Sequence, residues 1–188
     1  MRKLIVFNHV TLDGYFVSAN GDMNWARNGN DDPEYSAFVA ENAKGGGELL
    51  FGRITYDLMA SYWPTPIADQ HHPDVAKGMN SMPKVVFSRT LDHASWNNTK
   101  IVKGDIVSEV RKMKNESGPG MAIMGSGSII SQLAPEHLID EYQVMVDPVA
   151  LGKGRTMFEG IQEMLSLKLT GTQPFKNGKV FLCFEPAA

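Results

Sequence analysis

Short apolar runs alternate with segments of helical periodicity along most of the chain. The first run, residues 3–10, is almost continuously apolar, as expected of a strand that is covered on both faces. Helical patterns begin after Asp32-Pro33 and after Asp105, where an acidic side chain precedes the first turn. Further strands are expected at 48–51, 84–88, 100–102, 121–124, 142–146, 165–172 and 179–184, and further helices at 54–59 and 128–133. This alternation predicts one α/β domain over residues 1–188, with a mostly parallel sheet and helices on both of its faces.

Three segments interrupt this alternation. Residues 13–32 are polar and rich in Gly and Asn, and a connection of this length inside a domain is usually a functional loop. Residues 62–83 are rich in Pro, His and Asp, so we expect a surface excursion with about one helical turn near Val75. Lys176-Asn177-Gly178 separates the last two expected strands and predicts an antiparallel C-terminal hairpin.

Composition narrows the classes of function. The chain has 18 basic and 21 acidic side chains and a formal charge of −3, which argues against nucleic acid or an anionic membrane as the main partner. The single cysteine, Cys183, excludes an internal disulfide framework, and the histidines at 71–72 have no further ligand set near them, so no metal is expected. No secretory signal pattern and no apolar run near the ~20 residues of a membrane helix are present. These observations favour a cytoplasmic protein that acts on a small molecule.

Three of the expected strands end in small and basic residues. Glycine there lets backbone N–H groups approach a phosphate, and the first turn of the following helix favours negative charge. Arginine adds a planar fork that suits phosphate oxygens. Ligands bind beyond the carboxyl ends of the strands in open α/β sheets, so these segments predict a ligand with more than one phosphate, such as a dinucleotide. The segments are Gly52-Arg53-Ile54-Thr55, Ser88-Arg89-Thr90 and Gly125-Ser126-Gly127-Ser128.

Each segment also has a purely structural explanation. A strand–glycine–helix turn is often only a tight connection, and Gly52 can serve close packing alone. The third segment does not match the Rossmann fingerprint, because Ile130 stands where a third glycine is expected. Residues 152–156 superficially resemble a phosphate loop but lack the Ser or Thr that should follow Lys153, so we expect a solvated loop there.

The candidates for acid–base chemistry are three carboxylates, Asp13, Glu34 and Asp147. Each again has a structural alternative. Asp13 can form a turn with Gly14, Glu34 lies in a first helical turn that favours an acid, and Asp147 precedes a proline at a strand end. His9 lies within a strand and is expected to be a packed or edge histidine rather than a base.

Together these segments resemble the dihydrofolate reductase-like superfamily. The nearest branch is the RibD C-terminal domain, the reductase domain of bifunctional riboflavin-biosynthesis proteins, in its stand-alone form. The resemblance covers nearly the whole chain, and the spacing across many segments makes it more specific than any single motif. It is carried by residues 11–16, 21–25, 50–56, 84–89, 125–128, 140–141 and 148–158.

The resemblance implies a fold with NADPH lying across the strand ends. The first strand-end segment would hold the pyrophosphate and adenosine side, the second the 2′-phosphate, and the third the pyrophosphate and nicotinamide side. Trp25 would cover the nicotinamide, and Glu34 falls near the substrate-binding carboxylate of folate reductases. The implied cofactor residues are Gly52, Arg53, Thr55, Ser88, Arg89, Gly125, Ser126, Gly127 and Ser128.

Two positions depart from the riboflavin-pathway pattern. Tyr15 stands where those enzymes usually carry lysine, and Met124 where they usually carry an acid, and both positions fall in the implied substrate pocket. We expect Tyr15 and Trp25 to bind substrate and Asp13 or Glu34 to assist catalysis. The expected function is NADPH-dependent hydride transfer to a small heterocyclic or carbonyl substrate, with the pyrimidine intermediate of riboflavin synthesis as the named candidate. Dihydrofolate reduction and a non-catalytic nucleotide-binding module stay open as alternatives.

A homodimer is expected as the assembly. The stand-alone relatives that the chain resembles are commonly dimeric, and residues 142–146 and 180–184 are rich in apolar side chains that form strands. The hairpin should lie toward a sheet edge, where a second copy can cover exposed apolar surface. The alternative is a monomer in which helices of the same chain cover these strands.

Overall fold

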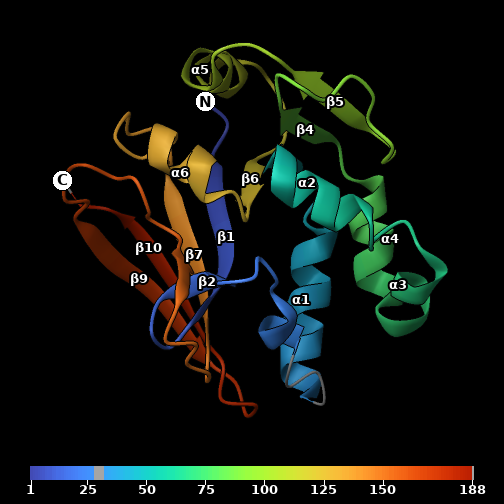
Figure 1. The fold of residues 1–188 in the computed structure, drawn as a ribbon, viewed down its shortest axis with the longest axis vertical. Helices are drawn as coiled ribbons and strands as arrows, with labels where there is room; N and C mark the ends of the chain where they lie inside the picture. Colours follow the sequence, from blue (N-terminus) through green and yellow to red (C-terminus); the bar gives the residue numbers. More distant parts are fainter. Residues whose placement is uncertain (28–31, 188) are drawn as a thin grey trace.

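The computed structural model describes residues 1–27 and 32–187. Eight strands form one sheet in the order β5-β4-β3-β6-β1-β7-β10-β9, and β2 and β8 form a separate two-stranded sheet (Figure 1). The strands from β5 to β7 run parallel to one another, and β10 is antiparallel to both of its neighbours. The strands are β1 (Leu4–Thr11), β2 (Tyr15–Ser18), β3 (Glu48–Gly52), β4 (Lys84–Phe87), β5 (Thr99–Val102), β6 (Met121–Met124), β7 (Glu141–Asp147), β8 (Gly154–Thr156), β9 (Leu167–Pro174) and β10 (Val180–Pro186).

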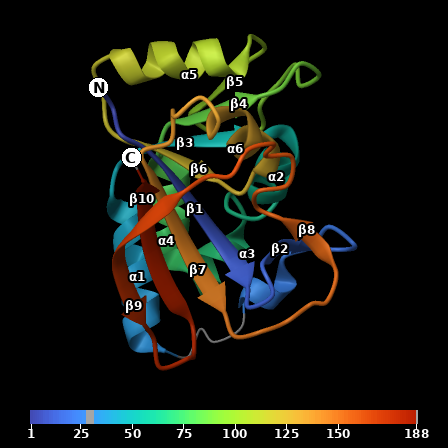
Figure 2. The same cartoon turned by 90° about the vertical axis from the view of Figure 1, so that its left-hand side faces the viewer.

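Helices cover both faces of the large sheet. On one face, α5 and α6 pack with Leu4, Val6 and Ile123 in the larger core. On the other face, α2 and α4 cover β3 and β4, and α1 lies behind the β9–β10 hairpin in Figure 2. The mostly parallel sheet, the helices on both faces and the antiparallel hairpin confirm the expected architecture. The helices are α1 (Pro33–Lys44), α2 (Arg53–Ala60), α3 (Pro66–His71), α4 (Pro73–Ser81), α5 (Ile106–Asn115) and α6 (Gly127–Leu133), with a 3₁₀ turn η1 (Asn24–Arg27).

Side-chain caps explain where α1 and α5 begin. One carboxylate oxygen of Asp32 accepts hydrogen bonds from the amides of Glu34 and Tyr35, and proline occupies the first turn of α1. Asp105 accepts in the same way from the amide of Ser108 at the start of α5. These two helix starts agree with the sequence prediction.

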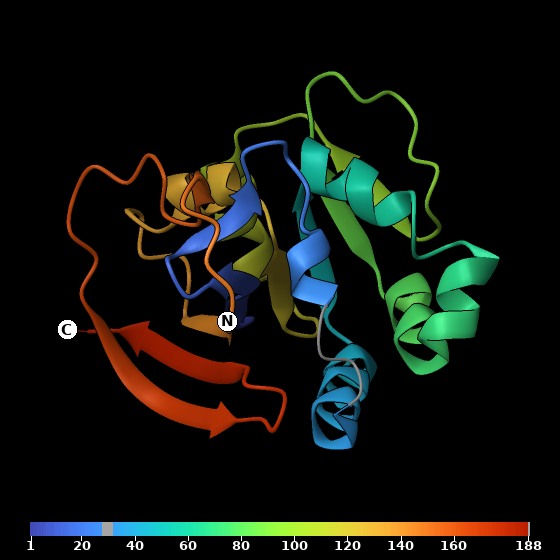
Figure 3. The same cartoon turned by 60° about the horizontal axis from the view of Figure 1, so that its bottom comes forward.

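The expectation of a surface excursion at residues 62–83 is wrong. This segment forms two helices, α3 and α4, and each has a proline in its first turn. Thr65 caps α3 by accepting from the amide of Ala68, and α4 buries Ala76, Gly78 and Met79. The pair lies at the opposite end of the molecule from the β9–β10 hairpin in Figure 3. Tertiary packing of α4 on α1 therefore stabilises helices in a segment of weak helix-forming composition.

Two expected loops contain strands. Residues 13–32 were predicted as one loop, but β2 and η1 lie within them, and residues 28–31 of that segment fall outside the described part of the chain. The expected solvated loop at 152–156 contains β8, which pairs with β2 in antiparallel register. A Cβ atom on Gly154 would lie 2.3 Å from the carbonyl oxygen of Val17, so glycine permits this close approach of the two strands.

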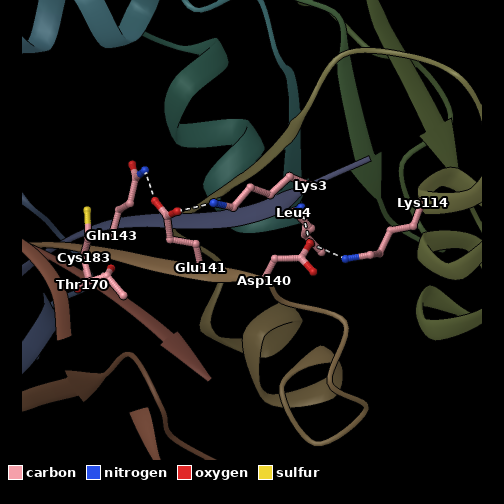
Figure 4. A network of polar contacts seen from close by, with 8 residues as sticks. All are labelled: Lys3, Leu4, Lys114, Asp140, Glu141, Gln143, Thr170 and Cys183. Atoms are coloured by element: carbon pink, nitrogen blue, oxygen red, sulfur yellow. Dashed lines mark hydrogen bonds and ion pairs between the residues drawn. The ribbon is translucent and has the colours of Figure 1, made fainter. Parts of the chain in front are cut away.

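A polar network ties the amino ends of β1 and β7 to α5 (Figure 4). Lys3 Nζ donates to Glu141 Oε2 at 2.5 Å. The carboxylate of Asp140 accepts from the amide of Leu4 at 2.7 Å and pairs with the ammonium of Lys114. None of the helices within residues 1–27 and 32–187 is long and apolar enough to cross a membrane.

Candidate functional site

A cavity of about 770 Å³ lies at the carboxyl ends of β3, β4, β5 and β6. Residues of β2 line it as well, so the small sheet forms part of its wall. The volume lies in the usual range for cofactor and small-molecule sites. The structure brings together on this wall all nine residues that were expected to bind the cofactor: Gly52, Arg53, Thr55, Ser88, Arg89, Gly125, Ser126, Gly127 and Ser128.

The turn between β6 and α6 requires glycine at position 125. Gly125 has a φ of +64°, and a Cβ atom there would lie 2.7 Å from Cγ2 of Thr55. Asn8 Oδ1 accepts from the amide of Gly125 at 2.7 Å, and Thr55 Oγ1 accepts from the amide of Ser126 at 3.2 Å. Side chains from β1 and α2 therefore fix the conformation of this turn.

The same turn is joined to the turn that follows β3. The amide of Gly52 donates to Ser126 Oγ at 2.8 Å, and this hydroxyl lies 3.1 Å from Thr55 Oγ1. Ser126 itself has a φ of +56°, an uncommon conformation for a residue other than glycine. Because neighbouring contacts hold it there, the two glycine turns form one connected wall of the cavity.

Arg53 lies at the start of α2 and reaches toward the segment that follows β4. Its Nε donates to Asp57 Oδ2 at 2.7 Å, and its Nη1 donates to Thr90 Oγ1 at 3.0 Å. Ser88 Oγ accepts from the amides of Thr90 and Leu91 and so orders this segment. Arg53 is thereby oriented beside the loop that also carries Arg89.

Arg89 is exposed and lies at the cavity together with Asp105. Hydrogen bonds from Ser108 to Asp105, supported by the charges of Arg89 and Arg111, hold the pKa of the Asp105 carboxyl below its usual value. Asp105 is therefore a carboxylate at neutral pH, with one oxygen engaged as the cap of α5. The positive side chains of Arg53 and Arg89 are two groups in the cavity that suit phosphate oxygens.

Comparisons with known proteins now identify the family. The model of the RibD C-terminal domain matches residues 2–181. The chain belongs to the RibD C-terminal domain family. This is a family of reductase domains. Among curated proteins, the uncharacterized protein YyaP of Bacillus subtilis is 28% identical over 184 residues, which cover 98% of this chain and 95% of that protein.

Solved structures show the same fold. A putative riboflavin biosynthesis protein from Shewanella sp. PV-4 has a TM-score of 0.70 at 23% identity, with 99% of both chains covered. Dihydrofolate reductase from Enterococcus faecalis, solved in complex with NADP(H), has a TM-score of 0.67 at 15% identity, with 99% of this chain and 97% of that chain covered. A deaminase/5-amino-6-(5-phosphoribosylamino)uracil reductase from Thermotoga maritima has a TM-score of 0.68 at 14% identity, and 99% of this chain spans 57% of that protein. The expected dihydrofolate reductase-like fold is confirmed.

In this RibD C-terminal domain, neither of the two expected catalytic carboxylates lines the cavity. Asp13 accepts hydrogen bonds from the hydroxyl of Thr11 and from the amides of Leu151 and Gly152. These bonds, that of Thr11 first, hold the pKa of the Asp13 carboxyl below its usual value. Asp13 therefore joins the turn after β1 to the chain after β7. Glu34 lies on α1 and accepts from the side-chain amide of Gln173 at 3.3 Å.

The two expected substrate-binding residues also lie outside this cavity. Tyr15 is on β2 and packs closely against Gly154 of β8. Trp25 is in η1 and is 9% exposed, and its indole Nε1 has no hydrogen-bond partner among residues 1–27 and 32–187. No group of three His, Cys or acidic side chains in the described ranges, 1–27 and 32–187, is arranged to hold a metal ion.

Sequence reasoning missed two residues of the cavity region. Asn8 fixes Gly125, and its signal was a buried amide interrupting an apolar run in the first strand. Arg155 of β8 lines the cavity, although it lies in residues 152–156, whose superficial likeness to a phosphate loop was set aside in favour of a solvated loop. The guanidinium of Arg155 is the third in the cavity after those of Arg53 and Arg89, and it lies on the side formed by β2 and β8.

Proposed function

We propose that this RibD C-terminal domain is an NADPH-dependent reductase that transfers a hydride to a small heterocyclic or carbonyl substrate. The observation that carries the proposal is the cavity at the strand ends, which is lined by two joined glycine turns and by Arg53 and Arg89. Family membership supports the reductase activity. The pyrimidine intermediate 5-amino-6-(5-phosphoribosylamino)uracil is the named candidate, because the Thermotoga neighbour is a reductase of that compound.

The residues of the cavity fit a dinucleotide. Gly125 has no space for a side chain, so its turn offers backbone at the cavity wall, and the start of α2 beside Gly52 favours negative charge. Arg53, Arg89 and Ser88 would hold the adenosine and 2′-phosphate end, and residues 125–128 the pyrophosphate and nicotinamide end. Bound NADPH would supply the hydride, while these residues bind and orient it.

A preference for NADPH over NADH tests the role of the two arginines. We expect the double variant Arg53→Ala/Arg89→Ala to raise the Kd for NADPH by about tenfold or more, since bonds to charged groups contribute roughly 1.5–3 kcal/mol each. The Kd for NADH, which lacks the extra phosphate, should change far less. Both values are measured by fluorescence titration, with Arg111→Ala on α5 as control because Arg111 pairs with Glu136 away from the cavity. An equal loss for both cofactors would refute the assignment.

Turnover distinguishes the reductase from its alternatives. NADPH oxidation is followed against a panel of pyrimidines, pterins and carbonyl compounds. Reduction of the ribosylaminopyrimidine or of a related heterocycle supports the proposal, and reduction of dihydrofolate supports the folate alternative. Tight NADPH binding without turnover of any compound favours a non-catalytic nucleotide-binding module.

A further inference from the structure

The turn between β9 and β10, residues 175–179, contains a buried cation. The ammonium of Lys179 forms an ion pair with Oδ1 of Asp147, the last residue of β7, and the two side chains are each 1% exposed. His9 Nδ1 lies 2.8 Å from the other carboxylate oxygen of Asp147, so this carboxylate is held from two sides. The His9–Asp147–Lys179 cluster therefore fixes the position of the ammonium.

A further partner of the ammonium belongs to η1. Lys179 Nζ donates to the carbonyl oxygen of Ala26 at 3.2 Å. Burial lowers the pKa of Lys179 to about 8, so the ammonium still carries its proton at pH 7. Because hydrogen bonds with one charged partner are roughly twice as strong as neutral ones, this bond ties η1 firmly to the hairpin.

The same turn also holds α1. The amide of Asn177 donates to Asp32 Oδ2 at 3.1 Å, and the other oxygen of this carboxylate caps α1. Lys179 Nζ lies 5.3 Å from the centroid of the Tyr35 ring in the first turns of α1. The hairpin turn therefore contacts η1 and α1 at once.

A second cavity lies beside η1. It has a volume of about 350 Å³ and is lined by residues of η1, α1 and the α3–α4 segment, including Ala26 and Tyr35. Open space therefore separates Ala26 from the α3–α4 segment. Packing contributes less to the position of η1 on this side, and the bond from Lys179 contributes more.

Hydrogen bonds continue from Ala26 to the wall of the cofactor cavity. The amide of Ala26 donates to the carbonyl oxygen of Met23 at 3.0 Å, and Met23 lines that cavity. The preceding carbonyl, that of Asp22, accepts from the amide of Ser18 at 3.1 Å, and Ser18 lines the same cavity. Residues 18–26, which we call the β2–η1 segment, thus connect the cofactor cavity to the cluster.

The β2–η1 segment lies at one particular end of the cofactor cavity. A Cβ atom on Gly127 would lie 3.4 Å from the ring of Phe16, so β2 packs against the turn before α6. In the proposed function this turn holds the pyrophosphate and nicotinamide end of the dinucleotide, whereas Arg53 and Arg89 hold the adenosine end. The segment therefore borders the nicotinamide half.

We propose that Lys179 is a positioning residue for cofactor binding, which acts through Ala26 by holding the β2–η1 segment against the nicotinamide half of the dinucleotide. This inference rests on the proposed function. In the described part of the chain, the lining of the cofactor cavity includes no residue of the β9–β10 hairpin. Lys179 thus couples two regions that do not share a binding surface. Such coupling is reciprocal, so a dinucleotide held by the segment must in turn stabilise the hairpin turn.

Hydrogen exchange of the unmodified protein at pH 7 tests this reciprocity. We expect NADPH to slow amide exchange in residues 23–26 and 175–179 by about fivefold or more, the lower end of the usual coupling between sites. The amides of Phe175 and Gly178 are suitable probes, because both donate within the turn. Helix α3 is the internal control and should not change.

Adenosine 2′,5′-bisphosphate is the matched ligand, because it contains the adenosine half of NADPH without the nicotinamide half. It should slow exchange near Arg53 and Arg89 and leave residues 23–26 and 175–179 unchanged. A hairpin turn that exchanges at the same rate with and without NADPH would overturn the inference. Equal protection of the turn by both ligands would overturn it as well.

A double variant removes the bond to Ala26 directly. Lys179→Met/Asp147→Asn keeps side chains of similar size and leaves no unpaired charge buried. We expect its Kd for NADPH to rise about threefold to tenfold, as for the loss of one hydrogen bond, and its Kd for adenosine 2′,5′-bisphosphate to stay the same. Lys176→Met, at an exposed position of the same turn, is the matched control and should change neither value.

The two titrations keep this inference apart from the proposed function. If the double variant binds NADPH as tightly as the unmodified protein, or loses affinity for both ligands alike, Lys179 is not a positioning residue for the nicotinamide half and the proposed function stands. If the unmodified protein does not bind NADPH, the proposed function is contradicted and the inference falls with it. Should the double variant fail to fold, the exchange experiment on the unmodified protein decides.

Discussion

Gly125 has no Cβ atom, and both its backbone conformation and the shape of the cavity at the strand ends depend on that absence. The residue needs a positive φ, and its missing side chain leaves room for Thr55, which in turn holds the next amide. Asn8 on β1 accepts from the amide of Gly125 and donates to its carbonyl oxygen, and these two bonds keep the turn in place from the other side. One residue therefore links the packing of β6 against β1 to the geometry of the proposed cofactor site.

Gly125→Ala should destabilise the protein by about 3 kcal/mol, from strain at positive φ together with overpacking against Thr55. The matched control is Gly14→Ala, where φ is +85° but no atom lies within 4 Å of the added Cβ, so only about 1–2 kcal/mol of strain is expected. Urea unfolding measures both values. If the free energy of unfolding falls equally in the two variants, the contact with Thr55 does not contribute to the cost of Gly125→Ala.

His9 gives the free energy of unfolding a specific pH dependence. Its pKa is about 3 in the folded protein against an ordinary value of 6.5, so between these values only the unfolded chain binds the proton. The stability that this difference provides is complete above about pH 6.5 and is lost as the pH falls toward 3, by about 1.4 kcal/mol per pH unit for one proton.

Urea unfolding of the unmodified protein and of His9→Asn at pH 7, 6 and 5 measures this contribution. The difference in unfolding free energy between the two proteins should shrink as the pH falls, because asparagine does not titrate. Other carboxylates titrate in both proteins and cancel in the comparison. A difference that stays constant from pH 7 to pH 5 would mean that His9 is not held neutral by the fold.

At the scale of elements, α4 packs on α1 through a glycine. A Cβ atom on Gly78 would lie 2.4 Å from the carbonyl oxygen of Ala43 near the end of α1, so the two helices approach closely only because Gly78 has no side chain. Tyr35 at the other end of α1 lines the second cavity with residues of the α3–α4 segment. The spacing of the helices and the shape of that cavity are therefore set together.

Gly78→Ala should lower the free energy of unfolding by about 2 kcal/mol through overpacking, although alanine is the better helix former by about 1 kcal/mol. Gly127→Ala in α6 is the control, since its Cβ would meet neighbours at an ordinary 3.4 Å. Thermal and urea unfolding should show a loss for the first variant and little change for the second. A stabilised Gly78→Ala protein would contradict the close contact.

The sequence predicted the elements with strong periodicity and missed those that depend on distant partners. The apolar strands and the capped helices α1 and α5 carry their signals locally. The helices α3 and α4 do not, because the polar composition of α4 is offset by its burial against α1, and α3 packs on α4. Likewise β8 has three residues and exists through its pairing with β2, far away in the chain.

The candidate site divides in the same way. The glycine, serine and arginine residues at the ends of β3, β4 and β6 line one cavity, because parallel strands end at one edge of the sheet. The role of a carboxylate depends on what the chain brings near it. Asp13 meets the amides of Leu151 and Gly152, 138 and 139 positions later in the chain, and Asp147 meets His9 and Lys179. Those pairings follow from the topology of the fold, and the local sequence pattern around each carboxylate does not specify that topology.

At the scale of the whole molecule, the large sheet ends in β9, whose outer edge has no neighbouring strand within the described residues. We propose that a second copy covers this end. Leu169 on β9 is 50% exposed, and the side chains of Val180 and Leu182 on β10 are only partly buried. An exposed edge beside apolar side chains is a typical surface for self-association.

Light scattering at micromolar concentration should therefore give a mass of about twice 20.7 kDa. Leu169→Lys places a charge in the proposed contact and should shift the mass toward that of one chain. Ile67→Lys on α3, also at an exposed apolar side chain but at the other end of the molecule, should leave the mass unchanged. A single-chain mass for the unmodified protein would refute the dimer.

The bond from Lys179 to the carbonyl of Ala26 joins residues that are 153 positions apart, and the bond from the Asn177 amide to Asp32 joins residues 145 positions apart. During translation, the ribosome therefore releases η1 and the start of α1 long before the residues that hold them. Contacts of such long range form late, since the loop between them must close first. On a nascent chain, the region around Ala26 and Tyr35 lacks these anchors until the hairpin emerges, and chaperones and proteases can reach it during that time.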